Sequence, residues 1–326
     1  QRGAQKHDCG GLDAKSRLPC LHSALPWSER KRHSLMDQFD VMEADWEAVG
    51  PLRDPVLVIA LRGWFDVAGV ATGALEWCIQ ERSVTVVASI DPDPFFDFTQ
   101  ERPETFIDED GDRHIRWPEN DFLVVRFPEG ARDLVLMSGV EPHLHWTTFA
   151  DCIVEAAQQL KCGVVVTVGA AAEGVPHTRS PQVFGSTTNG ALARRLGLSR
   201  PQYQGPTGVV GVIQERLDRE GLTGVSLRVG VPHYLSNAQH PKSSAALLRH
   251  LEHVLGVPTS HGMMYEEIQR WEELHDAAVD GDQQTEQYVK MLEDEYDRRT
   301  EASVPTGEDL AAEFERFLRE EQEGDD

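Results

Sequence analysis

The segment GAAAEGVPHTRSP at residues 169–181 concentrates side chains that could do chemistry. Glu173, His177, Thr178 and Arg179 lie within seven residues of one another. A carboxylate or an imidazole can transfer a proton, and a guanidinium can bind an anion through paired hydrogen bonds. The apolar run VVVTV directly precedes the segment. The sequence therefore predicts that these groups follow a buried strand.

A phosphate-binding loop is the first alternative for this segment. Gly169 and Gly174 have the GxxxxG spacing of a P-loop, but Val175 and Pro176 follow where Lys and Ser or Thr are needed. The amine that meets the phosphates and the hydroxyl that meets magnesium are both missing, so we reject this interpretation. The segment is then either a pocket wall or an ordered turn.

Two further segments carry comparable groups, DPDPFFDFTQERP at 91–103 and VPHYLS at 231–236. Carboxylates at strand ends can serve as an acid or a base, but Asp-Pro is also ordinary turn chemistry. The side chains that could act chemically here are Asp91, Asp97, Arg102, His233 and Tyr234.

Other nucleotide-binding and hydrolytic motifs are absent or incomplete. GPTGVVGVI at 205–213 is not a GxGxxG fingerprint, although a helix N-terminus there could face an anion. We prefer the simpler interpretation that Thr207 caps that helix. Neither a GxSxG nucleophile elbow nor an HExxH zinc motif occurs.

Alternating strands and helices must position these groups. Apolar runs predict strands at 56–61, 83–90, 104–107, 114–117, 122–127, 133–139, 163–168 and 224–232. Helical spacing predicts helices at 67–82, 146–161, 188–196, 208–220 and 243–255. This order is typical of an α/β fold with a mostly parallel sheet and helices on both faces.

In such a sheet, ligands bind beyond the carboxyl ends of the strands. If the relevant strands are neighbours, their loops converge on one edge and form a polar site. The candidate pocket or interface then comprises Asp91, Asp97, Arg102, Glu173, His177, Thr178, Arg179, Asn189, Thr207, His233 and Tyr234. The alternative, which we favour, is a buried polar network that fixes long loops, or a subunit contact.

The two ends of the chain differ from the middle. Residues 1–35 are basic and aperiodic, and we expect them to be a disordered extension of an α/β domain at 36–258. Their HDC and CLH motifs could supply zinc ligands, but the spacing matches no common zinc module.

Residues 259–326 predict an acidic helical domain of three amphipathic helices, the last capped by Thr306, with a solvated tail. Their apolar stripes either bind a partner or, as we prefer, pack on one another and on the sheet domain.

Composition excludes several classes of function. The net charge of −24 argues against binding nucleic acid or an anionic membrane surface. No apolar run approaches a membrane span or a signal peptide, so we expect a cytoplasmic protein. The five cysteines form no CxxC pair, and Cys78 and Cys152 lie in apolar helical patterns that predict small buried side chains in a reducing compartment. We predict no metal and no cofactor.

The same segments carry a resemblance to a known family. The chain resembles the proteasome assembly chaperone family, in its bacterial, actinobacterial-type branch, over about residues 37–322. The matching motifs are RGWFDVAG, DPDPFFDFTQERP, GAAAEGVPHTR, GPTGVVGVI and VPHYLSNAQHPKSSAALLRHLE, with EQYVKMLE and EFERFLRE near the end.

The resemblance implies a three-layer α/β/α domain like the phosphorylase/hydrolase fold, a small helical C-terminal domain, and homo-oligomers such as trimers. It implies a protein partner such as proteasome subunits, and it carries over no catalytic residue. Archaeal members can dock through a hydrophobic-Tyr-X tail, but this chain ends in GDD without Tyr, which argues against that route.

Two hypotheses follow. The first is a non-catalytic, oligomeric protein-interaction factor. The alternative is an enzyme or binding protein for a small anionic ligand, a nucleoside, phosphate or carboxylate, in which Arg102 or Arg179 holds the anion and His177 or His233 moves a proton.

Overall fold

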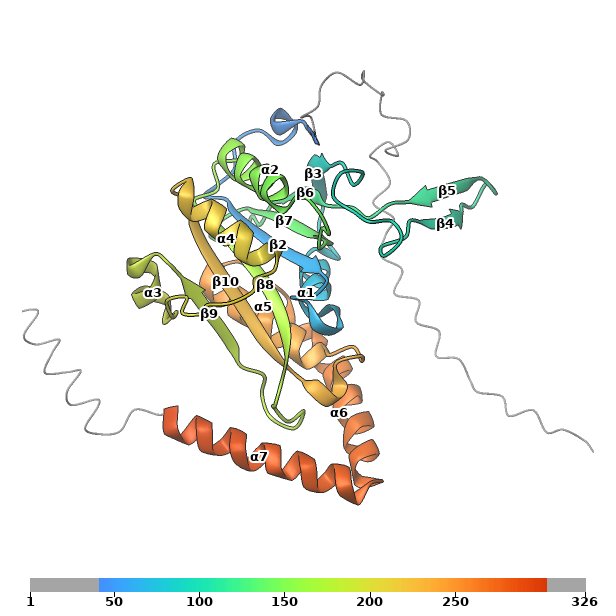
Figure 1. Ribbon diagram of the computed structural model, residues 1–326, viewed down its shortest axis with the longest axis vertical. Helices are drawn as coiled ribbons and strands as arrows, with labels where there is room; N and C mark the ends of the chain where they lie inside the picture. Colours follow the sequence, from blue (N-terminus) through green and yellow to red (C-terminus); the bar gives the residue numbers. More distant parts are fainter. Residues whose placement is uncertain (1–40, 304–326) are drawn as a thin grey trace, which may run out of the picture. The chain divides into compact units, whose positions relative to one another are not determined.

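A computed structural model describes residues 41–303 and contains a mixed eight-stranded sheet (Figure 1). The strand order is β1-β3-β6-β7-β2-β8-β10-β9. The strands are β1 (Met42–Ala44), β2 (Val56–Arg62), β3 (Val84–Ile90), β6 (Asp121–Val125), β7 (Leu134–Val140), β8 (Val164–Glu173), β9 (Val183–Thr187) and β10 (Thr223–Pro232).

The four central strands β7, β2, β8 and β10 are parallel. Strand β3 runs the same way, because it is antiparallel to β6 and β6 is antiparallel to β7. We call the edge at which these five strands end the carboxyl edge. Because β2, β3, β7, β8 and β10 all stop there, the loops that follow them share that edge of the sheet.

Helices cover both faces of the sheet, as the sequence predicted. On one face, α1 (Val70–Ile79) and α5 (Pro241–Leu255) pack in one buried cluster with the central strands. On the other face, α2 (Trp146–Gln159) and α4 (Val209–Arg219) pack in a second cluster. The expected three-layer α/β/α architecture is therefore confirmed. A further helix, α3 (Gly190–Leu196), follows β9.

The central strand β2 shows why the sequence folds this way. Its residues from Val56 to Leu61 are all buried, and it pairs in parallel with β7 on one side and β8 on the other. A strand that is covered on both faces needs a continuous apolar run rather than alternation, and VLVIAL supplies one.

A separate two-stranded sheet, β4 (Glu104–Ile107) with β5 (Arg113–Arg116), extends from the loops that follow β3. Its turn is held by Asp108, whose Oδ1 accepts hydrogen bonds from the backbone N–H groups of Asp110 and Asp112 at 3.0 and 2.8 Å.

Four short 3₁₀ helices lie elsewhere in residues 41–303: η2 (Trp46–Val49), η3 (Val67–Gly69), η4 (His233–Leu235) and η5 (His261–Met264).

Two helices follow the α/β layers, α6 (Tyr265–Asp280) and α7 (Gln283–Ser303). Gly281 and Asp282 separate the two helices. The third amphipathic helix, Thr306 and the segment 1–35 lie outside the described residues. The domain boundary after residue 258 stays a prediction. No helix among residues 41–303 is both long and apolar enough to cross a membrane.

Three strand assignments differ from the sequence prediction. Strand β8 continues through Gly169 to Glu173, whereas a loop was expected to begin at Gly169. The small residues there have weak strand propensity, but each pairs in register with β10, from Arg228 to Pro232. Strands β1 and β9 were not predicted, because each is short and forms only by pairing with one neighbour.

Candidate functional site

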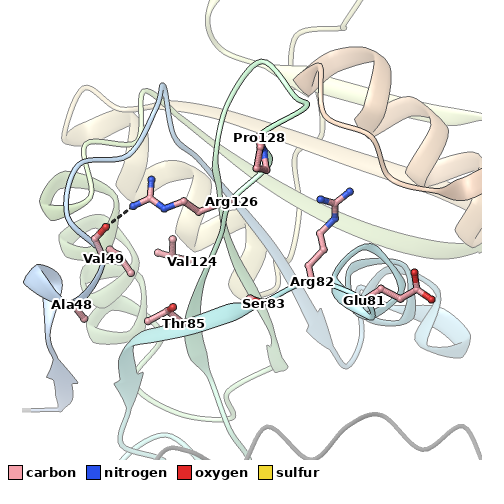
Figure 2. Close-up of a pocket in the computed structure, with 9 residues that line it drawn as sticks. All are labelled: Ala48, Val49, Glu81, Arg82, Ser83, Thr85, Val124, Arg126 and Pro128. Carbon is pink, nitrogen blue, oxygen red and sulfur yellow. Dashed lines mark hydrogen bonds between the residues drawn. The ribbon is translucent and has the colours of Figure 1, made fainter.

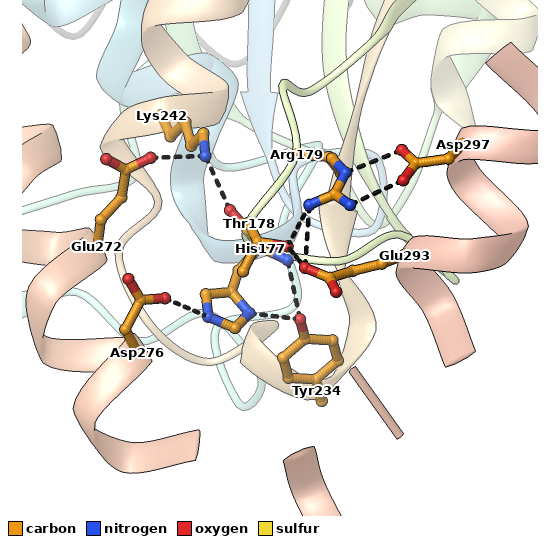
Figure 3. A network of polar contacts seen from close by, with 9 residues as sticks. All are labelled: His177, Thr178, Arg179, Tyr234, Lys242, Glu272, Asp276, Glu293 and Asp297. Carbon is orange, nitrogen blue, oxygen red and sulfur yellow. Dashed lines mark hydrogen bonds and ion pairs between the residues drawn. The ribbon is translucent and has the colours of Figure 1, made fainter. Parts of the chain in front are cut away.

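The loops that follow β8 and β10 meet at the carboxyl edge, because these two strands are neighbours. Figure 3 shows that His177 lies at the centre of this meeting point. Its side chain is 1% exposed. The Tyr234 hydroxyl lies 2.7 Å from His177 Nδ1 and accepts a hydrogen bond from the His177 backbone N–H at 2.9 Å. The Asp276 carboxylate, on α6, lies 3.2 Å from His177 Nε2.

The partners of His177 fix its tautomer. Asp276 can only accept, so Nε2 carries the proton and Nδ1 accepts the proton of the Tyr234 hydroxyl. Burial lowers the pKa of His177 and raises the pKa of Tyr234 to about 12, so both are neutral at pH 7. Both ring nitrogens are occupied within the chain. The His177 ring thus helps to hold α6 in place, and it has no free nitrogen for proton transfer to an outside molecule.

Arg179 makes a second contact with the C-terminal helices. Its guanidinium donates to both carboxylate oxygens of Asp297, at 2.8 and 2.7 Å, and to Glu293 Oε1 at 3.0 Å. The Thr178 hydroxyl donates to the same Glu293 oxygen at 2.5 Å. The hydrogen bond from Arg179 lowers the pKa of Asp297. The cation proposed for an anionic ligand is therefore bound by two carboxylates of α7.

Glu173 and His233 join the same assembly of loops and helices. The Glu173 carboxylate pairs with Arg228 at 3.0 Å, and its backbone carbonyl lies 3.0 Å from His233 Nδ1. A carbonyl only accepts, so Nδ1 donates to it, and Nε2 lies 2.9 Å from the Tyr288 hydroxyl on α7. The His233 ring thus bridges β8 and α7.

Sequence reasoning missed several members of this network. Lys242, at the start of α5, donates to the His177 carbonyl at 2.9 Å and pairs with Glu272 of α6 at 2.6 Å. Trp271 packs its ring 4.3 Å from His240 and donates to the Gln239 carbonyl at 2.7 Å. Trp271 recurs with Met264 and Ile268 at helical spacing in the sequence, which was a usable signal. Nothing in the local sequence marks Lys242 or Glu272.

The segment 91–103 lies at the same edge but not beside His177. Strand β3 is four positions from β8 in the sheet, which corresponds to about 19 Å at about 4.8 Å per strand. Asp97 accepts from Gln100 and Thr99, and these bonds lower its pKa to about 2. Asp91 accepts from the Asp93 N–H, and burial raises its pKa. Arg102 is exposed. The two Asp side chains thus build their own turn.

Two other predicted residues also lie apart from His177. Asn189 caps α3 through Oδ1, which accepts from two backbone N–H groups at 3.1 Å. It follows β9, which runs opposite to β10, and so lies at the other edge of the sheet. Thr207 does not cap α4 as we expected. Gly208 is the N-cap residue, and the Thr207 hydroxyl donates only to the Gly208 carbonyl at 3.4 Å.

The centre of the carboxyl edge carries an exposed aromatic side chain that the sequence prediction passed over. Glu141, after β7, accepts the Trp64 backbone N–H at 2.6 Å. A Cβ on Gly63 would lie 2.6 Å from Glu141 Cβ, so this close contact requires glycine. The Trp64 ring is 75% exposed and lies over Gly208, where an added Cβ would be 3.3 Å from the ring. The loops after β2 and β7 thus meet the start of α4 here.

Two pockets lie apart from the His177 network. The pocket in Figure 2 has a volume of about 530 Å³ and lies where β3 begins and β6 ends, away from the carboxyl edge. Arg82 pairs with Glu129 at 2.7 Å, and Arg126 binds the Val49 carbonyl and Asp133. Its cations are therefore occupied by internal partners.

The second pocket, of about 570 Å³, lies between β9 and α5. In residues 41–303, no cluster of three or more His, Cys, Asp or Glu side chains could hold a metal ion.

The chain has relatives among known protein families and solved structures. The model of the PAC2 family matches residues 60–279, more than half of the chain. A PAC2 family protein from Streptomyces avermitilis is 36% identical, with a TM-score of 0.68 over 72% of this chain and 100% of that one. No curated protein matches.

Two further solved structures carry functional names. A proteasome-assembly chaperone homologue from Mycobacterium tuberculosis is 34% identical, with a TM-score of 0.63 over 72% of this chain and 99% of its own. The Pyrococcus furiosus protein PbaB, an archaeal proteasome activator, is 17% identical, with a TM-score of 0.57 over 73% of this chain and 97% of its own. At that identity, PbaB is evidence for the fold alone.

Proposed function

The chain belongs to the PAC2 family, and from this premise we propose that it is a non-catalytic, oligomeric protein-interaction factor with a role related to proteasome assembly. The M. tuberculosis homologue supports the direction of the proposal, because its similarity extends over most of both chains. The cellular compartment that fits this role is the cytoplasm.

One observation carries the non-catalytic part of the proposal. The groups best suited to chemistry at the carboxyl edge hold the C-terminal helices in place. His177 uses both ring nitrogens, and Arg179 uses its guanidinium on two carboxylates. A general base needs a free nitrogen, and an anion site needs a free cation. The alternative of a small anionic ligand at this edge therefore gains no specific support.

A second observation favours binding of another protein. Large apolar side chains are exposed on η5, α6 and α7: Met263 is 70%, Leu274 67% and Met291 54% exposed. Exposed apolar area can bind another protein, and Met adapts its shape to different partners. We propose that α6 and α7 present the contact surface for the protein partner.

Capture by the purified protein tests this proposal. The full chain, immobilised, is expected to retain proteasome subunits from an extract of its own cells, identified by mass spectrometry. The double variant Leu274→Ser with Met291→Ser is expected to lose at least tenfold of the captured subunits, because apolar contact area is lost. The matched control, Leu274→Met with Met291→Leu, keeps the apolar area and should retain capture.

Light scattering of the purified chain tests the oligomeric part. A mass that is a multiple of the 36.4 kDa chain, a trimer for instance, is expected. A monomer across micromolar concentrations would contradict it. Equal capture of proteasome subunits by both double variants would remove α6 and α7 as the contact surface.

A further inference from the structure

The pocket between β9 and α5 belongs to none of the contacts described above. It is lined by Pro181, Gln182, Val183, Phe184, Ala246, Arg249, His250 and His253. Its apolar side chains come from Pro181, Val183 and Ala246, whereas the Phe184 side chain points to the opposite face of β9 from Val183. One side carries the cationic Arg249 together with two imidazoles. We call these eight residues the β9–α5 groove.

One feature indicates that the groove is incomplete as described. The His250 Nε2 atom is buried and has no hydrogen-bond partner among residues 41–303. A buried polar nitrogen gains free energy when it finds a partner.

The chain leaves the described region close to this groove. On α7, the Tyr296 hydroxyl donates to the Ser180 carbonyl at 2.7 Å, and Ser180 directly precedes Pro181 of the groove. The helix continues for seven residues to Ser303, about 10 Å at 1.5 Å per residue. Residues 304–309 can then span up to about 20 Å. The segment that follows α7 can therefore reach the groove.

The chemistry of that segment complements the groove. Residues 304–326 contain nine Asp or Glu and two Arg, a net charge of −7. Leu310, Phe314 and Phe317 recur at the spacing of one helix face. An acidic segment with an apolar stripe matches a groove with apolar side chains and a cationic side. In a chain whose net charge is −24, a cationic surface of this kind is the natural position for such a segment.

We propose that residues 304–326 of the same chain dock in the β9–α5 groove, with the stripe of Leu310, Phe314 and Phe317 against Val183 and Ala246 and the acidic side chains beside Arg249 and His253. The segment then covers the groove between α5 and the edge strand β9.

Disulfide trapping tests the position of the segment. In a chain with Cys9 and Cys20 replaced by Ser, Glu313→Cys is combined with His253→Cys in the groove. The control combines Glu313→Cys with Arg219→Cys on α4, which packs on the other face of the sheet. The remaining cysteines Cys78, Cys152 and Cys162 are buried. Because a disulfide needs Cα atoms within about 7 Å, only the groove pair should close rapidly under mild oxidation.

The outcomes decide the proposal. An intrachain link at residue 253 that forms at least tenfold faster than the link at 219 supports it. Equal rates at the two positions overturn it. A link at 253 that joins two chains, seen as a doubled mass on a non-reducing gel, also overturns it, because the occupant is then a second copy.

Hydrogen exchange provides a readout without new cysteines. In the variant Phe314→Ser with Phe317→Ser, peptides covering 181–184 and 249–253 should take up deuterium several-fold faster than in the wild-type chain. Phe314→Leu with Phe317→Leu keeps the apolar stripe and should leave uptake unchanged. Equal uptake in all three proteins would overturn docking in the groove.

Discussion

At the scale of single residues, buried histidines act as neutral hydrogen-bonding groups. His177 is enclosed by Tyr234 and Asp276, and His240 is buried beside Trp271, with its Nδ1 accepting the Ser243 N–H at 3.2 Å. Burial lowers the pKa of His177 and lowers the pKa of His240 to about 4. Protonation would place a charge in a poorly solvated position, so the folded state favours the neutral ring.

This argument predicts the direction of the pH dependence. The pKa of His240 is lower in the folded chain than its ordinary value of 6.5, so the unfolded chain binds more protons in this range. The stabilisation is full above about pH 6.5 and is lost as the pH falls toward 4. A shift of that size corresponds to on the order of 3 kcal/mol in the free energy of unfolding.

Urea unfolding at pH 7 and pH 4.5 measures this loss. The variant His240→Asn keeps an acceptor at the start of α5 but does not titrate, so its free energy of unfolding should fall less between the two pH values. The carboxyl groups that titrate in the same range are common to both proteins, so the difference between the two losses of unfolding free energy isolates His240. Equal losses in the two proteins would show that His240 is not the cause.

Gly169 shows a second requirement at the residue scale. An added Cβ there would lie 2.1 Å from the Phe65 ring and 2.5 Å from the Phe65 carbonyl oxygen. The backbone N–H of the next residue, Ala170, donates to that same carbonyl at 2.8 Å. The loop after β2 therefore packs directly on β8, and only glycine permits this distance.

Substitution at this position should be costly. Gly169→Ala is predicted to lower the free energy of unfolding by roughly 1–3 kcal/mol, because the Phe65 ring and its backbone must move. Gly163→Ala, directly before the same strand, has no atom within 4 Å of the added Cβ and should change stability by less than about 0.5 kcal/mol. Chemical denaturation of both variants checks the prediction.

At the scale of elements, the loops after β8 and β10 serve as the docking surface for α6 and α7. Asp276 and Glu272 attach α6, and Asp297 and Glu293 attach α7. Most of these ion pairs are partly solvated, so each contributes little stability alone. The buried Trp271 ring supplies the apolar part of the contact. The polar groups thus set where the helices lie, and burial holds them there.

Removal of the Trp271 ring should detach the helices. Trp271→Ala is expected to cost about 3–5 kcal/mol in the stability of this contact, because a large buried side chain is lost. Limited proteolysis should then cut within 265–303 while the α/β core resists. Leu274→Ala, less than one turn away but two-thirds exposed, should behave as wild type. Cleavage at equal rates in both variants would contradict a role for Trp271 in docking.

At the scale of the whole molecule, charge is the dominant feature. The chain carries 55 acidic and 31 basic residues. Such an excess keeps a protein soluble but makes the compact state repel itself. The arginines that the structure describes are often placed where they offset this repulsion, as Arg179 and Arg216 are.

Salt should therefore stabilise the protein. The melting temperature is predicted to rise by several degrees between about 10 and 150 mM salt, as the Debye length shortens from about 30 to about 8 Å. The partly solvated ion pairs lose strength over the same range, but each is worth little. Scanning calorimetry in NaCl and KCl should give the same rise. A fall in the melting temperature would show that the ion pairs outweigh the repulsion.

The sequence by itself determined the layers of this protein. Continuous apolar runs such as VLVIAL are typical of strands that are buried on both faces. The helices predicted between these strands must then act as the crossover connections of a parallel sheet. The motifs at 91–103, 169–179 and 231–252 were enough for the family resemblance, which the PAC2 match confirmed. These features are local, or repeat at short range, and so are readable along the chain.

Only the tertiary structure decided which polar groups meet. Strand order placed β8 beside β10 and put β3 four positions away, so His177 lies with Tyr234 and not with Asp97. Asp276 and Asp297 complete the network from helices about 100 residues later in the chain, and Glu272 has no local pattern that marks it. Contacts between distant segments depend on the order of strands and on packing, and neither is encoded in the spacing of neighbouring residues.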